Sequence, residues 1–189
     1  MKTDTIAALS TDTRGAISIV RMSGEDSLRI AQRIFFPFYD RFIPLRVYHG
    51  HIKKGDTFLD EVLLHVSHET HSYTGEQVVE INCHGGISGK IILNLILSEG
   101  ARLAKNGEFT LRAFLNRKID LLQAEAVHAC IQAKTEKGLI AAVRTISGKL
   151  SSEIEKVRKQ LLEMQAHIEA ILDFPEDDVD SFQREDIRK

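Results

Sequence analysis

The first two thirds of the chain alternate between short apolar runs and turn-forming residues, a pattern typical of β-strands. Strands are predicted over residues 5–9, 16–21, 48–52, 61–67 and 77–82. In the last of these, Val79 and Ile81 point to one side, so Glu80 and Asn82 point to the other. One side of this strand is therefore apolar, and the other carries a carboxylate and a carboxamide.

Apolar residues that recur every three or four positions predict two helices between and after these strands. The first helix follows residues 23–26, Ser-Gly-Glu-Asp, which resemble a capping box, and it ends before Pro37. The second covers residues 87–97 and is ended by Gly100. Because helices and strands do not alternate regularly, the order predicts an α+β domain with a mixed sheet.

Beyond Asp120, which is predicted to cap a first helix, the pattern is helical throughout. A second, longer helix is predicted to run to about Leu172, with apolar residues spaced about 3.5 positions apart, the seam period of helical bundles and coiled coils. A helix cannot bury such a stripe against itself. We therefore expect partner helices from another chain or from sequence outside this one, and Phe174-Pro175 is expected to stop the helix.

The composition changes near residue 118 and suggests where domains end. Most glycines and two of the three prolines come earlier, whereas residues 121–172 contain no proline. We place a mixed α+β domain at residues 1–118, a helical segment at 119–178 and a charged linker at 179–189.

Charge and cysteine content narrow the possible functions. With 25 basic and 27 acidic residues the net charge is −2, so the bulk electrostatics do not call for nucleic acid or an anionic membrane. Two cysteines, no signal peptide and no apolar run of membrane length indicate a reduced, cytoplasmic protein. Two cysteines are also too few soft ligands for a typical zinc site.

Three chemical motifs are incomplete in the stretch after the strand at 77–82. Residues 85–90 are similar to a phosphate-binding loop, but the glycine spacing is one residue short and Ile91 stands where Ser or Thr would hold magnesium. His84-Gly85-Gly86 is similar to an esterase oxyanion segment, yet the chain has no Gly-x-Ser-x-Gly nucleophile elbow. Cys83 and His84 are strand neighbours that point to opposite faces, so they cannot pair as nucleophile and base. We predict neither a nucleotide nor a hydrolase site here.

The histidines at 65, 68 and 71 are three residues apart, a spacing that would align them on a helix. This region is predicted as a strand end and a loop, so we interpret them as surface residues.

Three charged residues are better candidates for a binding site. Glu80 lies inside an otherwise apolar strand, where a carboxylate is costly unless it is paired or used for recognition. Arg21 ends a strand, which a solvated strand end explains equally well. Lys118 lies in a loop that enters a helix, and composition alone would make it an ordinary exposed lysine.

Several ordered segments together resemble the N-terminal part of the MnmE (TrmE) family of tRNA modification GTPases. They include Val-Arg-Met-Ser-Gly at 20–24, Ser-Tyr-Thr-Gly-Glu at 72–76, Val-Glu-Ile-Asn-Cys-His-Gly-Gly at 79–86, Gly-Glu-Phe-Thr at 107–110, Arg-Ala-Phe-Leu-Asn at 112–116, and Asp-Phe-Pro-Glu at 173–176. The resemblance extends from the start of the chain to about residue 178.

The resemblance implies a tetrahydrofolate-binding, homodimer-forming N-terminal domain followed by the first half of a central helical domain. In this family a GTPase domain, which uses GTP, potassium and magnesium, is inserted into the helical domain, and we expect this chain to lack it. With the flavoprotein MnmG, as a heterotetramer, the family adds aminomethyl or carboxymethylaminomethyl groups at carbon 5 of the tRNA wobble uridine. A folate, in its 5-formyl or 5,10-methylene form, is the one-carbon source, and no membrane is involved.

Matching the family motifs places its folate-binding residues on Arg21, Glu80 and Lys118. A pterin presents a ring N–H and an exocyclic amine side by side, which one carboxylate such as Glu80 can accept. Arg21 and Lys118 would counter the folate carboxylates or polarise its carbonyl. The chain departs from the family in the turn at residues 11–16 and at Asn106, where proline is usual, so the loop near the pocket is expected to differ in shape.

We expect no independent catalysis from this chain. Two other interpretations remain open: a folate-dependent aminomethyltransferase that acts alone, since such enzymes use a related folate-binding fold, and a non-catalytic dimerisation scaffold.

Overall fold

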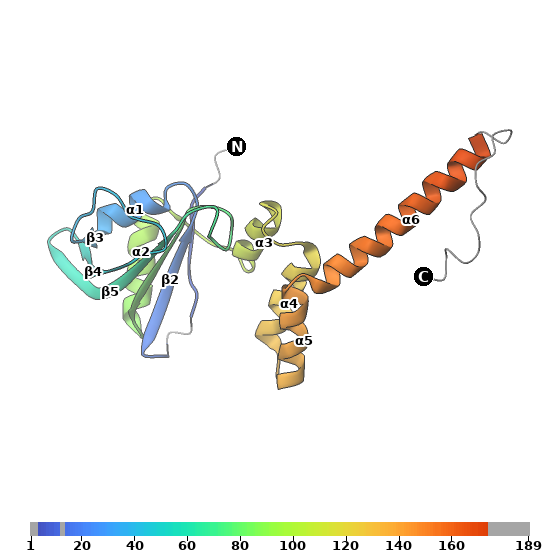
Figure 1. The fold of residues 1–189 in the computed structure, drawn as a ribbon. Coiled ribbons are helices and arrows are strands. Elements are labelled where there is room, and N and C mark those ends of the chain that lie inside the picture. The colour runs from blue at the N-terminus through green and yellow to red at the C-terminus, as the bar shows by residue number, and fades with distance from the viewer. Residues whose placement is uncertain (1–3, 12–13, 174–189) are drawn as a thin grey trace. The chain divides into compact units, whose positions relative to one another are not determined.

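Seven strands of the chain form one mixed sheet, drawn in Figure 1. The strands are β1 (Ile6–Leu9), β2 (Ile17–Ser23), β3 (Phe35–Phe36), β4 (Val47–Lys54), β5 (Thr57–Ser67), β6 (Val78–His84) and β7 (Arg102–Leu103). Their order is β3-β4-β5-β6-β2-β1-β7, and among the described residues only the β1–β7 pair is parallel. The predicted α+β class and mixed sheet are confirmed.

The computed structural model describes residues 4–11 and 14–173, and the chain divides into two units at residues 124 and 125. The first unit contains the sheet with helices α1 (Ser27–Ile34), α2 (Ile87–Ser98) and α3 (Glu108–Leu115). Three further helices follow: α4 (Leu121–Gln132), which starts at the end of the first unit, α5 (Glu136–Ile146) and α6 (Lys149–Asp173). The predicted linker at 179–189 and the helix stop at Phe174-Pro175 lie outside the described residues.

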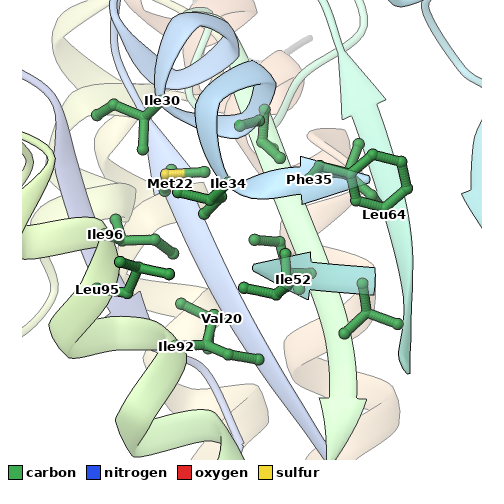
Figure 2. Close-up of a cluster of buried hydrophobic side chains, with 14 of the residues drawn as sticks. Val20, Met22, Ile30, Ile34, Phe35, Ile52, Leu64, Ile92, Leu95 and Ile96 are labelled. Carbon is green, nitrogen blue, oxygen red and sulfur yellow. The ribbon is translucent and has the colours of Figure 1, made fainter. Parts of the chain in front are cut away.

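Helices α1 and α2 pack against one face of the sheet and close the hydrophobic core (Figure 2). The period of two along each strand supplies the apolar face, because alternate residues of a strand point to the same side. Val20, Ile81 and Leu64 are paired neighbours on β2, β6 and β5, and all three are fully buried. Ile30 of α1 and Ile92 of α2 pack into the same cluster. The intervening strand residues, Glu80 among them, must therefore face the opposite side.

Two predicted helix boundaries are confirmed by their capping geometry. Asp120 precedes α4, and its carboxylate accepts a hydrogen bond from the backbone N–H of Gln123, 2.9 Å away. The Gln123 side chain accepts one in return from the backbone N–H of Asp120, also at 2.9 Å, which completes a capping box. Gly100, at φ 111°, follows the end of α2.

The capping box predicted at residues 23–26 is wrong. Ser23 belongs to β2, and its hydroxyl bonds to Thr74 and Glu76 instead of capping a helix. Helix α1 begins at Ser27 after Asp26, whose side chain makes no capping hydrogen bond. Pairing of Ser23 with Ile6 and Val78 extends the strand past Arg21, so tertiary partners override the local signal.

The single long helix predicted to run to about Leu172 is also wrong, because it is interrupted between α5 and α6. Gly148 adopts φ 78°, a left-handed conformation that glycine reaches without strain and that ends a helix. Strands β3 and β7 and helix α3 were not predicted. The two strands have only two residues each, too few for a periodic signal.

We predict that Ile92→Ala destabilises the chain far more than its neighbour Ile91→Ala. Ile92 is fully buried between α2 and the sheet, whereas Ile91 is 40% exposed. Truncating a buried isoleucine removes about 2–5 kcal/mol from the free energy of unfolding. Urea denaturation of both variants measures the difference, and equal losses would contradict the assigned core.

Candidate functional site

Arg21 and Glu80, predicted separately as binding residues, form a direct ion pair on the sheet face that α1 and α2 leave uncovered. They are paired neighbours on β2 and β6, and Nε of Arg21 donates to Oε1 of Glu80 at 2.6 Å. The two side chains are 30% and 26% exposed. The positive charge of Arg21 therefore balances the negative charge of Glu80. A ligand can still reach the Glu80 carboxylate from the open side of the sheet.

Glu80 has a second neighbour that the sequence did not identify. His65 of β5 is its paired residue on the other side, and Nδ1 of His65 lies 4.0 Å from Oε2 of Glu80. Leu64 and Val66, on either side of His65 in the strand, are apolar and buried. Because successive side chains of a strand point to opposite faces, this pattern indicates that His65 faces the uncovered side. Only the strand register shows that it lies beside Glu80, so the surface interpretation of His65 was incomplete.

Helix α3 places an aromatic ring beside Arg21. The Arg21 guanidinium lies 5.6 Å from the centre of the Phe109 ring, within the range of a cation–π contact. The helix is held to the loop before β6 by two polar contacts: the hydroxyls of Tyr73 and Thr110 are 3.0 Å apart, and Asn116 donates to the Thr74 carbonyl at 2.7 Å. Arg21 thus contacts both the Glu80 carboxylate and an apolar ring.

A buried arginine fixes α3 more firmly than these contacts. Arg112 is only 7% exposed. Its Nη1 donates to the Asp4 carbonyl oxygen at 2.8 Å and to the Glu76 carboxylate at 3.0 Å, and its Nη2 donates to the Asp4 carboxylate at 2.7 Å. Because Ser23 also donates to Glu76, the network reaches the end of β2, two residues from Arg21.

Arg102 extends the same network and shifts the ionisation of its acids. Its Nη2 lies 2.7 Å from Glu108 and its Nε lies 2.6 Å from Asp4. The hydrogen bond from Arg102 is the main reason that the pKa of Glu108 falls from 4.5 to about 2, with a further bond from the Lys105 N–H. The hydrogen bond from Arg102 likewise lowers the pKa of Asp4.

Lys118, the third predicted site residue, lies over the loop that precedes β6. Its ammonium donates to the Thr70 carbonyl at 2.9 Å, and its side chain covers Gly75 so closely that an added Cβ there would lie 3.0 Å from it. Within the described residues Lys118 forms no ion pair or hydrogen bond with Arg21 or Glu80. The structure brings two of the three predicted residues into direct contact and places the third on the adjoining loop.

The His-Gly-Gly segment at the end of β6 is held by the protein's own groups. Burial acts to raise the pKa of Asp60, but hydrogen bonds from Ser88 and His84 lower it overall, and Asp60 in turn raises the pKa of His84. Gly85 has no room for a side chain, because the Gly15 carbonyl occupies that space. Cys83 is buried while His84 is exposed, which confirms that they point to opposite faces.

Comparison with known proteins gives a consistent result along the chain. The profile described as "GTP-binding protein TrmE N-terminus" matches residues 5–118, and "MnmE helical domain" matches residues 121–189. The chain belongs to the TrmE/MnmE family. Proteins named tRNA modification GTPase MnmE are similar to it: 48% identical in Alkaliphilus oremlandii, 45% in Symbiobacterium thermophilum and 46% in Clostridioides difficile.

These alignments cover 94%, 99% and 94% of this chain but only 40%, 42% and 40% of the three relatives. The chain therefore spans about two fifths of the length of the MnmE relatives it matches. In the part of the chain that the structure describes, no helix is long and apolar enough to span a membrane.

The TrmE/MnmE-like segments found in the sequence are those that build the site. The segment at 72–76 supplies Tyr73, Thr74 and Glu76, and those at 107–116 supply Phe109 and Arg112. Residues that are far apart in the sequence thus form one network of contacts around Arg21 and Glu80.

We predict that Arg112→Met destabilises the protein by about 3 kcal/mol, because it leaves the Glu76 carboxylate, only 11% exposed, without its cation. Arg102→Met is the matched control, since Arg102 is 41% exposed and its loss leaves Glu76 paired. Thermal and urea denaturation should show a clearly smaller loss of unfolding free energy for Arg102→Met than for Arg112→Met. A smaller loss for Arg112→Met than for Arg102→Met would contradict the central role of Arg112.

Glu108 should make stability depend on pH in the acid range. Its pKa is about 2 in the folded chain against an ordinary 4.5, so its stabilising effect is complete above 4.5 and is lost as the pH falls toward 2. Urea denaturation across this range should show a steeper loss of unfolding free energy in the parent than in Glu108→Gln. Identical pH dependence would rule out the folded-state pairing of Glu108.

Proposed function

We propose that this chain binds a tetrahydrofolate through Glu80 and Arg21 and serves as the folate-binding, dimer-forming part of a tRNA modification GTPase. The observation that carries the proposal is the Glu80 carboxylate, held by Arg21 on an uncovered sheet face and still 26% exposed. The family membership of the chain supports the same assignment.

The residues present fit the pterin end of a folate. A pterin offers two adjacent donors, a ring N–H and an amine, and an ionised carboxylate has two oxygens that accept such a pair. Arg21 holds the Glu80 side chain in one orientation, so little side-chain entropy is lost when the ligand binds. Phe109, whose ring centre lies 5.6 Å from the Arg21 guanidinium, adds apolar surface near the pair.

Lys118 is proposed to act from the edge of this site. Its ammonium is 2.9 Å from the Thr70 carbonyl on an exposed loop, where it can exchange that bond for a ligand carboxylate or carbonyl oxygen. Arg21 already donates to Glu80, so Lys118 is the better candidate for the distant carboxylates of the folate.

The bound folate, in its 5-formyl or 5,10-methylene form, would supply a one-carbon unit. In the whole protein we propose that this unit becomes the methylene carbon bonded to carbon 5 of a tRNA wobble uridine, within an aminomethyl or carboxymethylaminomethyl group whose amino part comes from a separate amine, and that MnmG takes part in the reaction. We assign GTP, potassium and magnesium to a GTPase domain, residues 1–118 to the folate-binding and homodimerising domain, and residues 119–178 to the first half of the helical domain. The cytoplasm is the proposed location.

The direct test is folate binding by calorimetry. We predict that the chain binds 5-formyltetrahydrofolate and that Glu80→Gln weakens binding by about 1–3 kcal/mol, the cost of losing a charge-assisted pair. Glu61→Gln is the matched control, because Glu61 is another exposed carboxylate of the same sheet and pairs with His49, not with Arg21.

Equal affinity of the parent and Glu80→Gln would remove Glu80 from the site. If no folate binds at any concentration tested, the result would favour a non-catalytic dimerisation scaffold. Aminomethyl transfer by the isolated chain would favour an independent transferase.

A further inference from the structure

Arg21 and His65, the cross-strand partners of Glu80, approach different oxygens of its carboxylate. Arg21, from β2, donates to Oε1 at 2.6 Å, and His65, from β5, has Nδ1 4.0 Å from Oε2. Register fixes this arrangement, since Arg21, Glu80 and His65 are direct partners across three adjacent strands. Side chains at such positions have Cβ atoms about 4.5–5.5 Å apart, so they are held side by side by the backbone.

From this geometry we infer that His65 is a positioning residue for the ligand that Glu80 accepts, an inference that rests on the proposed function. An ionised carboxylate has about four acceptor positions, two on each oxygen. Arg21 occupies one position on Oε1, and His65 stands beside Oε2. One acceptor position on each oxygen then remains for a ligand with two adjacent donors, which is the pattern of a pterin edge.

The 4.0 Å separation is too long for a hydrogen bond but within reach of a small side-chain movement. Such contacts are often long before a ligand binds and shorten in the complex. His65 has no competing hydrogen bond among the described residues, and its side chain is 31% exposed, so it can move. Val47, its paired neighbour on β4, offers no polar group.

Another histidine on the same sheet face provides a matched control. His49 of β4 lies 2.7 Å from Glu61, so it already has a carboxylate partner that is not Glu80. Its substitution changes a histidine of the same face without changing the acceptor positions of Glu80.

The test measures binding of 5-formyltetrahydrofolate to the whole chain by calorimetry. His65→Leu should weaken binding about ten- to a hundredfold, the effect of one hydrogen bond to a charged acceptor. His65→Gln, which keeps a donor, should stay within about twofold of the parent. His49→Leu should leave the affinity unchanged.

A double-mutant cycle separates positioning from a general structural effect. If His65 acts through Glu80, His65→Leu has no further effect once Glu80 is Gln. An equal loss in both backgrounds, or equal losses for the Leu and Gln variants, would overturn the inference. Where Glu80→Gln leaves no measurable binding, the comparison of Leu with Gln at position 65 decides.

The outcomes also separate this inference from the proposed function. If Glu80→Gln weakens binding and His65→Leu does not, the folate site stands and the role of His65 is refuted. If the parent chain binds no folate, both are refuted.

Discussion

The buried guanidinium of Arg112 is the interaction on which the arrangement of the first unit depends. It joins the segment before β1 through Asp4, the loop before β6 through Glu76, and its own helix α3. Burying this charge is favourable only because several oxygens surround it at hydrogen-bond distance. The network therefore demands that all three segments meet at one place, and that place adjoins the uncovered face of the sheet.

The fixed position of α3 determines which groups border the uncovered face of the sheet. Without α3 held in place, Arg21 would be a charged residue near the end of a strand with Glu80 as its only partner. With it, the Phe109 ring lies next to the guanidinium and the loop at 68–77 borders the same area. The opposite face is closed by α1 and α2, so the sheet separates a packed core from a polar surface that can receive a ligand.

Strand positions with a strong period of two were predictable, and so was the exposure of Glu80 on the side opposite Ile81. Arg21 and Glu80 were found as candidates, but their contact was not, because pairing across strands is set by register and not by the residues of either strand alone. His65 was read as a surface residue for the same reason. Ser23 satisfied a local capping pattern, yet its hydroxyl bonds to Thr74 and Glu76, which both lie in a loop distant in the sequence.

The sequence by itself determined the α+β class, the apolar face of each longer strand, and the family to which the chain belongs, since these depend on local periodicity and on ordered motifs. Only the tertiary structure decided that β2, β6 and β5 lie side by side, and hence that Arg21, Glu80 and His65 form one row. It also decided that Gly148 divides the last helices. Local patterns fix which way a side chain points, whereas the packing of the whole unit fixes which side chains it meets.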